Sequence, residues 1–203
     1  MRGSEPSPAL RVARLPEDIE LARGLFLEYA HWLKVDLCFQ GFERELATLP
    51  GAYAPPFGRL LLAGPAGQAF GCIALRPIEA AKACSEPEKA CSEPEKACAE
   101  GDKEFSKPAK ACGETGPERS TPGTVGEVKR LYVQPSHRAG GWGRRLAETL
   151  LADARAIGYR ELKLDTLDWM GDARRLYARL GFRECDRYYD NPLPGVVYMS
   201  LEL

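Results

Sequence analysis

The residues best suited to chemistry form a glycine-rich run between basic side chains, Arg138-Ala139-Gly140-Gly141-Trp142-Gly143-Arg144. Glycine has no Cβ atom, so backbone N–H groups in such a run can approach an anion closely. Aliphatic residues over 125–133 predict a strand before the run, and apolar residues at helical spacing predict a helix after it, ending at Gly158. The start of a helix adds partial positive charge. Strand, glycine turn and helix together therefore predict a phosphate site.

The spacing of these glycines distinguishes the run from two other phosphate loops. A dinucleotide fingerprint needs three spaced glycines with an acid about 20 residues on, and a Walker loop needs Gly-Lys-Ser/Thr. The run instead fits Arg/Gln-x-x-Gly-x-Gly/Ala. This pattern resembles the acyl-CoA pyrophosphate loop of the GNAT superfamily of N-acetyltransferases. A second segment, LYARLGF over 176–182, resembles the Leu-Tyr-x-x-x-Gly-Phe signature of that family.

The resemblance implies an α/β fold of the α+β type, with a mixed, mostly antiparallel central sheet flanked by helices. It implies a single acetyltransferase domain over residues 1–203. The chain pattern is compatible with this fold. We expect strands over residues 9–15, 59–63, 68–76, 125–133, 161–167, 182–187 and 196–203. We expect helices in the apolar stripe over 19–33, around 42–49, after the glycine run, and over 171–180.

A seven-residue repeat beginning at Lys82 interrupts this pattern, with KACSEPE as its first two copies. Proline recurs in the repeat and breaks helices, so a coiled coil is excluded despite the period. The apolar positions are mostly Ala and Cys, which offer little area to offset the entropy of ordering. We therefore expect residues 79–124 to be a disordered insert in a surface loop.

The bulk composition excludes several classes of function. The net charge is −1, so no global field favours nucleic acid or an anionic membrane. No apolar run approaches membrane-spanning length, and the N-terminus lacks a signal-peptide core, so we expect a cytoplasmic protein. The seven cysteines include no Cys-x-x-Cys pair, so we expect reduced thiols and no metal site. A monomer or a homodimer is expected.

The resemblance also implies where acetyl-CoA, the expected acyl donor, would bind. Backbone amides of residues 138–144 would hold its pyrophosphate. The end of the preceding strand, Leu131, Tyr132 and Val133, would contact the pantetheine arm and offer an amide to the thioester carbonyl. Amides placed in this way stabilise charge that develops on the oxygen.

Two side chains are candidates for proton transfer. Glu127 is the candidate general base, because a carboxylate among apolar strand residues can accept a proton. The alternative is an exposed glutamate paired with Lys129 or Arg130. Tyr177 is the candidate general acid for the leaving thiolate. The alternative is a ring packed in the core, with a hydroxyl that only contacts the cofactor.

The acceptor is less well defined by the sequence. Tyr188 and Asp190 are candidates for substrate recognition, because Asp190 can bind a cationic amine; the alternative is an Asp-Asn-Pro turn. Gln40 and Tyr53 lie in a region that either lines the acceptor site or packs in the core. We expect transfer to a primary amine of a small molecule. A protein lysine or N-terminal acetyltransferase, or a catalytically silent acyl-CoA-binding module, are the alternatives.

Overall fold

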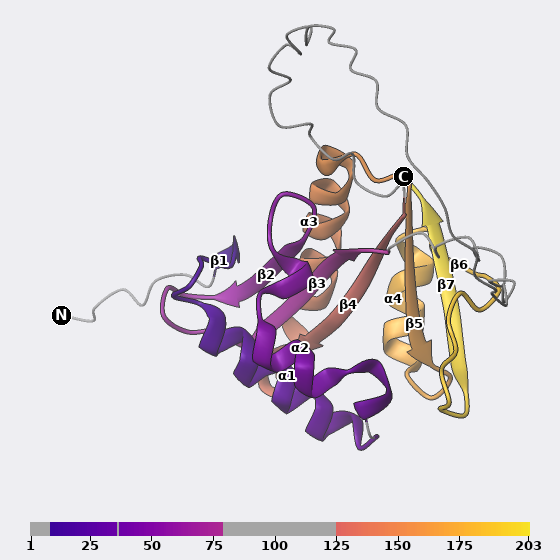
Figure 1. Ribbon diagram of the computed structural model, residues 1–203, viewed down its shortest axis with the longest axis horizontal. Coiled ribbons are helices and arrows are strands. Elements are labelled where there is room, and N and C mark those ends of the chain that lie inside the picture. Colours follow the sequence, from indigo (N-terminus) through magenta and orange to yellow (C-terminus); the bar gives the residue numbers. More distant parts are fainter. Residues whose placement is uncertain (1–8, 36, 79–124) are drawn as a thin grey trace, which may run out of the picture. The chain divides into compact units, whose positions relative to one another are not determined.

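A computed structural model describes residues 9–35, 37–78 and 125–203 (Figure 1). The predicted insert over 79–124 lies outside the described residues. Within them, seven strands form one sheet in the order β1-β2-β3-β4-β5-β7-β6. The strands are β1 (Ala9–Val12), β2 (Arg59–Gly64), β3 (Gly71–Pro77), β4 (Val125–Val133), β5 (Glu161–Leu167), β6 (Arg183–Glu184) and β7 (Val196–Glu202).

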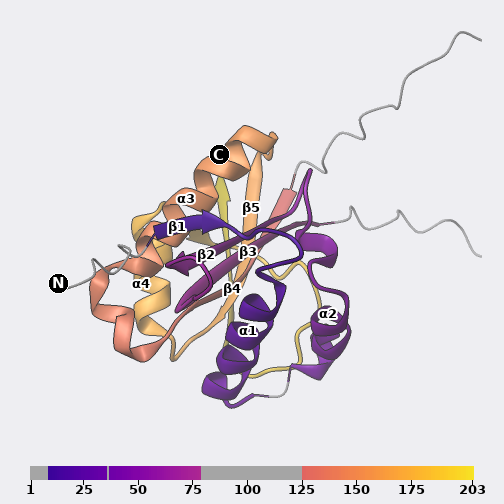
Figure 2. The same ribbon diagram turned by 90° about the vertical axis from the view of Figure 1, so that its left-hand side faces the viewer.

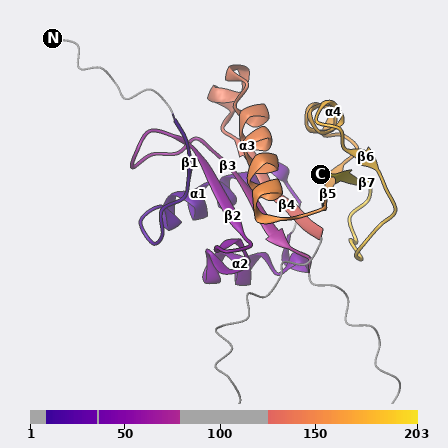
Figure 3. The same cartoon turned by 90° about the horizontal axis from the view of Figure 1, so that it is seen from above.

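Helices cover both faces of this sheet. They are α1 (Ile19–Leu33), α2 (Phe42–Thr48), α3 (Trp142–Ile157) and α4 (Gly171–Arg179), with short 3-10 turns η1 (Cys38–Gln40), η2 (Gly51–Tyr53) and η3 (Pro135–Gly140). Figures 2 and 3 show α1 and α2 on one face and α3 on the other, with α4 on the α3 side. Each face has its own apolar core, centred on Phe26 and Leu62 under α1 and on Leu146 and Leu150 under α3.

The sheet is antiparallel except between β4 and β5, which run parallel. Their pairing covers only three positions and ends at Glu127 and Lys163. Beyond this point the two strands diverge, as Figure 1 shows. Backbone groups on the facing edges therefore lack a neighbouring strand, which is where a ligand can supply the missing partners.

A β-bulge in β4 changes which side chains share a face. Cys72 lies opposite Tyr132 and Ala74 lies opposite Lys129, so β4 holds one extra residue in this interval. Arg130 accommodates it with a φ of 57°, in the left-handed region. As a result, Lys129 and Arg130 both contact residues on the α2 side of the sheet, although alternation would place them on opposite faces.

The structure confirms the predicted fold class and the strand–turn–helix unit around the glycine run. Three predicted strands are shorter by two residues or more: the first ends at Val12, the one expected over 68–76 begins only at Gly71, and the one expected over 182–187 covers only Arg183–Glu184. The chain leaves the sheet after β6 into a segment that contains Pro192 and Pro194.

Candidate active site

The glycine-rich turn lies where the sequence predicts it, between β4 and α3. Gly141 caps α3 with a φ of 70°, a conformation that suits glycine. The first bond into the helix runs from the N–H of Arg145 to the carbonyl of Gly141 at 3.2 Å. The amides of residues 142–144 come before it and have no acceptor within the helix. No side chain caps this terminus and its first turn holds no acid, so the turn fits a diphosphate.

Aromatic contacts hold this turn against the sheet. The rings of Phe70 and His137 stack with centroids 4.1 Å apart, and Trp142 meets Phe70 edge-on at 5.1 Å. Arg138 folds back and donates from Nε to the carbonyl of Val133 at 3.0 Å. The predicted loop residues are therefore fixed by packing as well as by glycine conformation.

A groove of about 220 Å³ lies between the end of β4 and the start of α4. Three aromatic side chains line it, Trp32, Tyr132 and Trp169, together with the cation of Arg138. The Arg138 guanidinium lies 4.5 Å from the centre of the Trp32 ring, and Trp169 packs against Trp32 at 5.8 Å. Trp169 is 55% exposed, which is unusual for so large an apolar side chain. The groove offers a ligand apolar walls, the Arg138 cation and, at the start of α4, the carboxylate of Asp172.

Next to this groove is an inner chamber of about 50 Å³, where β4 and β5 separate. The two hollows share the lining residues Leu131, Met170 and Ala173. Tyr177 of α4 also lines the chamber, so the predicted pantetheine-contact residue Leu131 and the predicted acid meet there. Tyr177 is buried and packs edge-on against Phe182. Burial raises the pKa of its hydroxyl, which therefore stays protonated.

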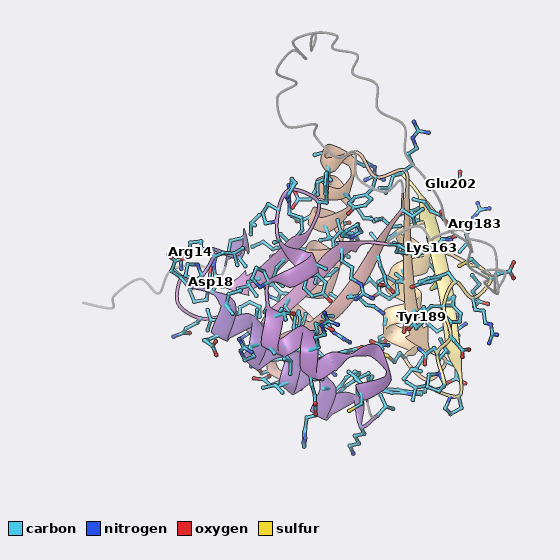
Figure 4. All side chains as sticks on the ribbon, viewed as in Figure 1. Arg14, Asp18, Lys163, Arg183, Tyr189 and Glu202 are labelled. Carbon is cyan, nitrogen blue, oxygen red and sulfur yellow. The ribbon has the colours of Figure 1, made fainter. Side chains whose placement is uncertain are left out.

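An outer pocket of about 510 Å³ adjoins the chamber on its other side. Gln40 and Lys129 line both hollows. The outer pocket is lined also by Glu127, Tyr188 and Tyr189, and Figure 4 shows Tyr189 beside β5. The groove, the chamber and the outer pocket thus adjoin in series, with the predicted base and acid in neighbouring hollows.

Glu127 is 3% exposed and its carboxylate accepts hydrogen bonds at both oxygens. Oε2 accepts from Nε and Nη2 of Arg76 at 2.7 and 2.6 Å. Oε1 lies 3.0 Å from Nζ of Lys129 and accepts from the hydroxyl of Tyr188 at 2.9 Å. The side chain is therefore buried, and its partners are Arg76, Lys129 and Tyr188. Arg130 pairs instead with Glu45 of α2, at 2.6 and 2.9 Å.

Lys129 joins Glu127 to a second carboxylate, Asp165 of β5. Its Nζ lies 2.7 Å from Oδ1 of Asp165, and both side chains are almost buried, at 6% and 14% exposure. Burial alone would raise the pKa of Asp165, but the adjacent Lys129 cation outweighs it and the pKa is lowered. Asp165 lines the inner chamber and stays ionised at neutral pH.

Three polar side chains meet beside the chamber. Gln40 donates from Nε2 to the hydroxyl of Tyr189 at 3.3 Å, and Asn191 donates to the same hydroxyl at 2.9 Å. This contact joins η1 to the segment between β6 and β7. The Oε1 atom of Gln40 is buried, and it accepts no hydrogen bond from the residues that the structure describes.

The predicted substrate residues are placed differently from one another. Tyr188 lines the outer pocket and bonds Glu127. Asp190 is exposed and pairs with Arg187 at 3.3 Å, with a side-chain exposure of 90%. Tyr53 is buried and donates to Glu45 at 2.8 Å, so it packs in the core. The structure thus brings Tyr188 to Glu127, and it does not bring Asp190 to either of them.

Four side chains of the site were not predicted from the sequence: Arg76, Asp165, Trp32 and Trp169. Cross-strand register brings the first to Glu127, because Arg76 lies opposite Glu127 in the β3–β4 ladder. Asp165 alternates with buried Leu164 and Thr166 in β5, and this pattern was the signal for a polar side chain on the opposite face. The two tryptophans come from α1 and the β5–α4 loop, and nothing local relates them.

The family model described as the acetyltransferase (GNAT) family matches residues 28–182. This range includes the glycine turn, both predicted proton-transfer residues and the β4–β5 opening. The chain belongs to the GNAT family of acetyltransferases. A GNAT enzyme of this kind transfers an acetyl group, so the predicted enzyme class is confirmed.

Two relatives of this GNAT enzyme cover almost its whole length. An uncharacterised N-acetyltransferase of Schizosaccharomyces pombe is 31% identical, over 96% of this chain and 94% of the relative. One from Dictyostelium discoideum is 35% identical, over 96% of this chain and 99% of the relative. An acetyltransferase structure from Salmonella typhimurium, solved with its cofactor acetyl-CoA, matches with a TM-score of 0.56 at 15% identity, over 97% of this chain and 94% of that one.

Two further findings concern the described residues alone. None of their helices has the length and apolar character needed to cross a membrane. Within the same residues, no group of His, Cys, Asp and Glu side chains has an arrangement that could hold a metal ion.

Proposed function

We propose that this GNAT enzyme transfers the acetyl group of acetyl-CoA to the primary amine of a small molecule. The observation that carries the proposal is the series of hollows from the groove through the inner chamber to the outer pocket, at the point where β4 and β5 diverge. The presence of acetyl-CoA in the Salmonella typhimurium structure of the same fold supports the choice of donor.

The donor site is built from backbone groups and a few cations. Amides of residues 142–144, with Arg138, Ala139, Gly140 and Arg144 around them, would hold the diphosphate. Leu131, Tyr132 and Val133 line the groove, where the pantetheine arm would lie. When bound, acetyl-CoA supplies a thioester whose acyl carbon an amine can attack. The residues of β4 near the bulge are the source of the amide that would hold the thioester carbonyl oxygen.

Proton transfer uses side chains of the two neighbouring hollows. Tyr177 keeps its hydroxyl proton at neutral pH, and we assign it the role of proton donor to the leaving sulfur. The sequence predicts Glu127 as the base. Its carboxylate already accepts from Arg76, Lys129 and Tyr188, so an amine would have to displace one of these partners to reach it.

The size of the acceptor follows from what surrounds the chamber. The contact of Gln40 with Tyr189 joins two segments beside it, and the chamber itself has a volume of about 50 Å³. A small amine can pass such a contact more easily than a protein surface can. Transfer to a protein lysine or N-terminus is the second candidate, and the larger outer pocket is the feature that favours it. A cytoplasmic location and a monomer or homodimer stay predictions of the sequence.

The experiment measures free thiol released from acetyl-CoA over a panel of small primary amines and lysine peptides. Tyr177→Phe is expected to lower the rate by about 100-fold, the usual contribution of a positioned acid. Tyr159→Phe is the matched control, because its buried hydroxyl binds the carbonyl of Phe57 away from these hollows. Acetyl-CoA binding, followed by the fluorescence of Trp32 and Trp169 in the groove, is expected to persist in both variants.

Each other result has a definite meaning. Acetyl-CoA binding without thiol release on any acceptor would favour a silent acyl-CoA-binding module. Faster turnover of lysine peptides than of small amines would favour a protein acetyltransferase. Neither binding nor release would contradict the proposal altogether.

A further inference from the structure

We propose that Asp165 and Gln40 form the subsite that holds the acceptor nitrogen, and that the acceptor binds there as a neutral amine. This subsite rests on the proposed acetyl transfer and names the groups that touch the amine. Glu127 then acts as a positioning residue that holds Arg76, Lys129 and Tyr188. The proposal follows from the hydrogen-bonding capacity that each buried acceptor has left.

Glu127 has little capacity left. A carboxylate offers about four lone-pair sites. Arg76 occupies two of them through Nε and Nη2, while Lys129 and Tyr188 occupy the other two. An amine or a water molecule would have to displace one of these short contacts before it could reach the carboxylate.

Asp165 is different, because its partners leave one lone-pair site unused. Oδ1 lies 2.7 Å from Nζ of Lys129. Oδ2 has Nδ2 of Asn191 at 3.4 Å, a long contact, and the hydroxyl of Tyr189 also hydrogen-bonds the carboxylate. A carboxylate has about four lone-pair sites, so Asp165 keeps room for one further donor, and it lines the inner chamber.

Gln40 supplies a second acceptor without a donor. Its Oε1 atom is buried and has no hydrogen-bond partner among the described residues, although buried carbonyl groups are normally paired. Gln40 lines the same chamber as Asp165. Asp165 can accept a further hydrogen bond, and Oε1 of Gln40 accepts none from the described residues. Because both side chains line one small hollow, they indicate a ligand that brings hydrogen-bond donors.

A neutral primary amine matches this pair of acceptors. It has two N–H groups, one for each acceptor, and a lone pair that stays free for attack. The Lys129 cation already pairs with Asp165 at 2.7 Å, so this carboxylate attracts an ammonium ion less strongly than an unpaired carboxylate would. The groups around Asp165 are Lys129 with its second partner Glu127, Arg130 with its partner Glu45, and the side chains of Tyr29, Tyr177, Tyr189 and Asn191.

The bond changes balance with these residues. The nitrogen forms a bond to the acyl carbon and the carbon–sulfur bond breaks. One N–H proton leaves the nitrogen for Oδ2 of Asp165, which is in contact with it. The sulfur takes the hydroxyl proton of Tyr177, and solvent carries a proton from Asp165 back to Tyr177. The net products are an amide and a free thiol.

The first experiment compares phenethylamine with its β,β-difluoro analogue, whose amine is less basic, from mildly acidic to mildly alkaline pH. Phenethylamine is chosen because the rings of Tyr188 and Tyr189 line the adjoining pocket. The panel amine with the fastest turnover is compared with its own difluoro analogue in the same way. Within each pair we expect the two amines to have the same KM when concentrations are expressed as free base. A KM that instead follows total amine would overturn the neutral-amine assignment.

The second experiment measures acceptor KM and kcat in Asp165→Asn. In this variant Lys129 will bind the oxygen of the new amide side chain. The NH₂ group of that side chain then faces the N–H group of the acceptor amine, so two donors lie opposite each other. We expect acceptor KM to rise by about 10- to 100-fold, the worth of a hydrogen bond to a charged group, with unchanged acetyl-CoA binding. Glu161→Gln is the control, since Glu161 is also on β5 and lines none of the three hollows.

Gln40→Leu keeps the proposal testable if Asp165→Asn does not fold. It removes Oε1 at similar size and is expected to raise acceptor KM by about 5- to 10-fold. An acceptor KM equal to that of wild type in both Asp165→Asn and Gln40→Leu would overturn the subsite. An acceptor KM that rises only in Glu127→Gln, and in neither of these two variants, would assign the amine contact to Glu127 and overturn it as well. Failure of the wild type to bind acetyl-CoA or release thiol is a separate result and contradicts the proposed function itself.

Discussion

Replacing Glu127 with glutamine tests whether this carboxylate organises the outer pocket. Glutamine has the same size but exchanges one acceptor oxygen for an NH₂ donor. That donor must face either Arg76 or Lys129, and both of these side chains only donate. Whichever way the amide turns, one buried contact becomes donor against donor. We therefore expect a loss of stability that a purely catalytic base would not show.

The size of this loss follows from the exposure of each partner. Removing one member of a buried ion pair costs about 3–5 kcal/mol. Arg76 is 35% exposed, so water can replace much of the contact that it loses with Glu127. Lys129 is only 6% exposed, but its ion pair with Asp165 remains in the variant. We expect the free energy of unfolding to fall by about 2 kcal/mol. For a chain of this length that corresponds to about 4–8 °C in Tm.

Urea denaturation of Glu127→Gln and Glu161→Gln provides the measurement. Glu161, the control carboxylate, is the first residue of β5, is 31% exposed and lies 3.7 Å from Nζ of Lys163. The stability of Glu161→Gln should therefore stay within about 0.5 kcal/mol of wild type. A Glu127→Gln variant as stable as the control, with thiol release abolished, would refute the positioning role. It would instead support the base predicted from the sequence.

Two further predictions concern the donor turn and the ion pair beneath the site. In Gly141→Ala the added Cβ has no atom within 4 Å, but the residue must keep a φ of 70°, which is strained for alanine. We therefore expect the free energy of unfolding, measured by urea denaturation, to fall by about 1 kcal/mol. Acetyl-CoA binding, measured by fluorescence, should also become weaker. Arg130 holds the pKa of buried Glu45 below its ordinary 4.5, so wild-type stability should fall as pH drops below that value. Arg130→Met removes the largest effect that lowers this pKa, while the Tyr53 hydroxyl and the Arg76 charge still lower it. The urea midpoint of the variant should therefore fall less steeply than that of wild type as pH drops below 4.5, and equal slopes in both proteins would contradict the assignment.

Features set by local sequence could be predicted well. The apolar spacing of residues 142–157 and the glycines at its two ends fix α3 without reference to the rest of the chain. The same holds for α4, where Gly181 follows the helix with a φ of 99°. Glu127 could be proposed as a buried carboxylate because its strand neighbours are apolar.

Features set by register could not be predicted. In a strand a shift of one residue moves every side chain to the other face, and the bulge at Arg130 produces such a shift inside β4. Nothing in the segment VKRLY identifies the extra residue, because a non-glycine residue with positive φ leaves no compositional signal. The pairing of Lys129 with Asp165 therefore appears only once β4 and β5 are aligned. Asp190, chosen for its charge, lies at the surface beside Arg187, and its role in substrate recognition stays a prediction.

Two kinds of incompleteness coincide in this molecule, and together they support the proposed position of the reaction. The backbone ladder between β4 and β5 ends at Glu127 and Lys163, so the facing edges beyond it lack strand partners. In the hollow beside that opening, Asp165 and Gln40 keep unused acceptor capacity, while the carboxylate of Glu127 is fully paired. Folding normally satisfies buried polar groups of both kinds, because leaving them unpaired is costly. The first gap fits the extended arm of a donor and the second fits the N–H groups of an acceptor, so the two substrates would meet where the sheet opens.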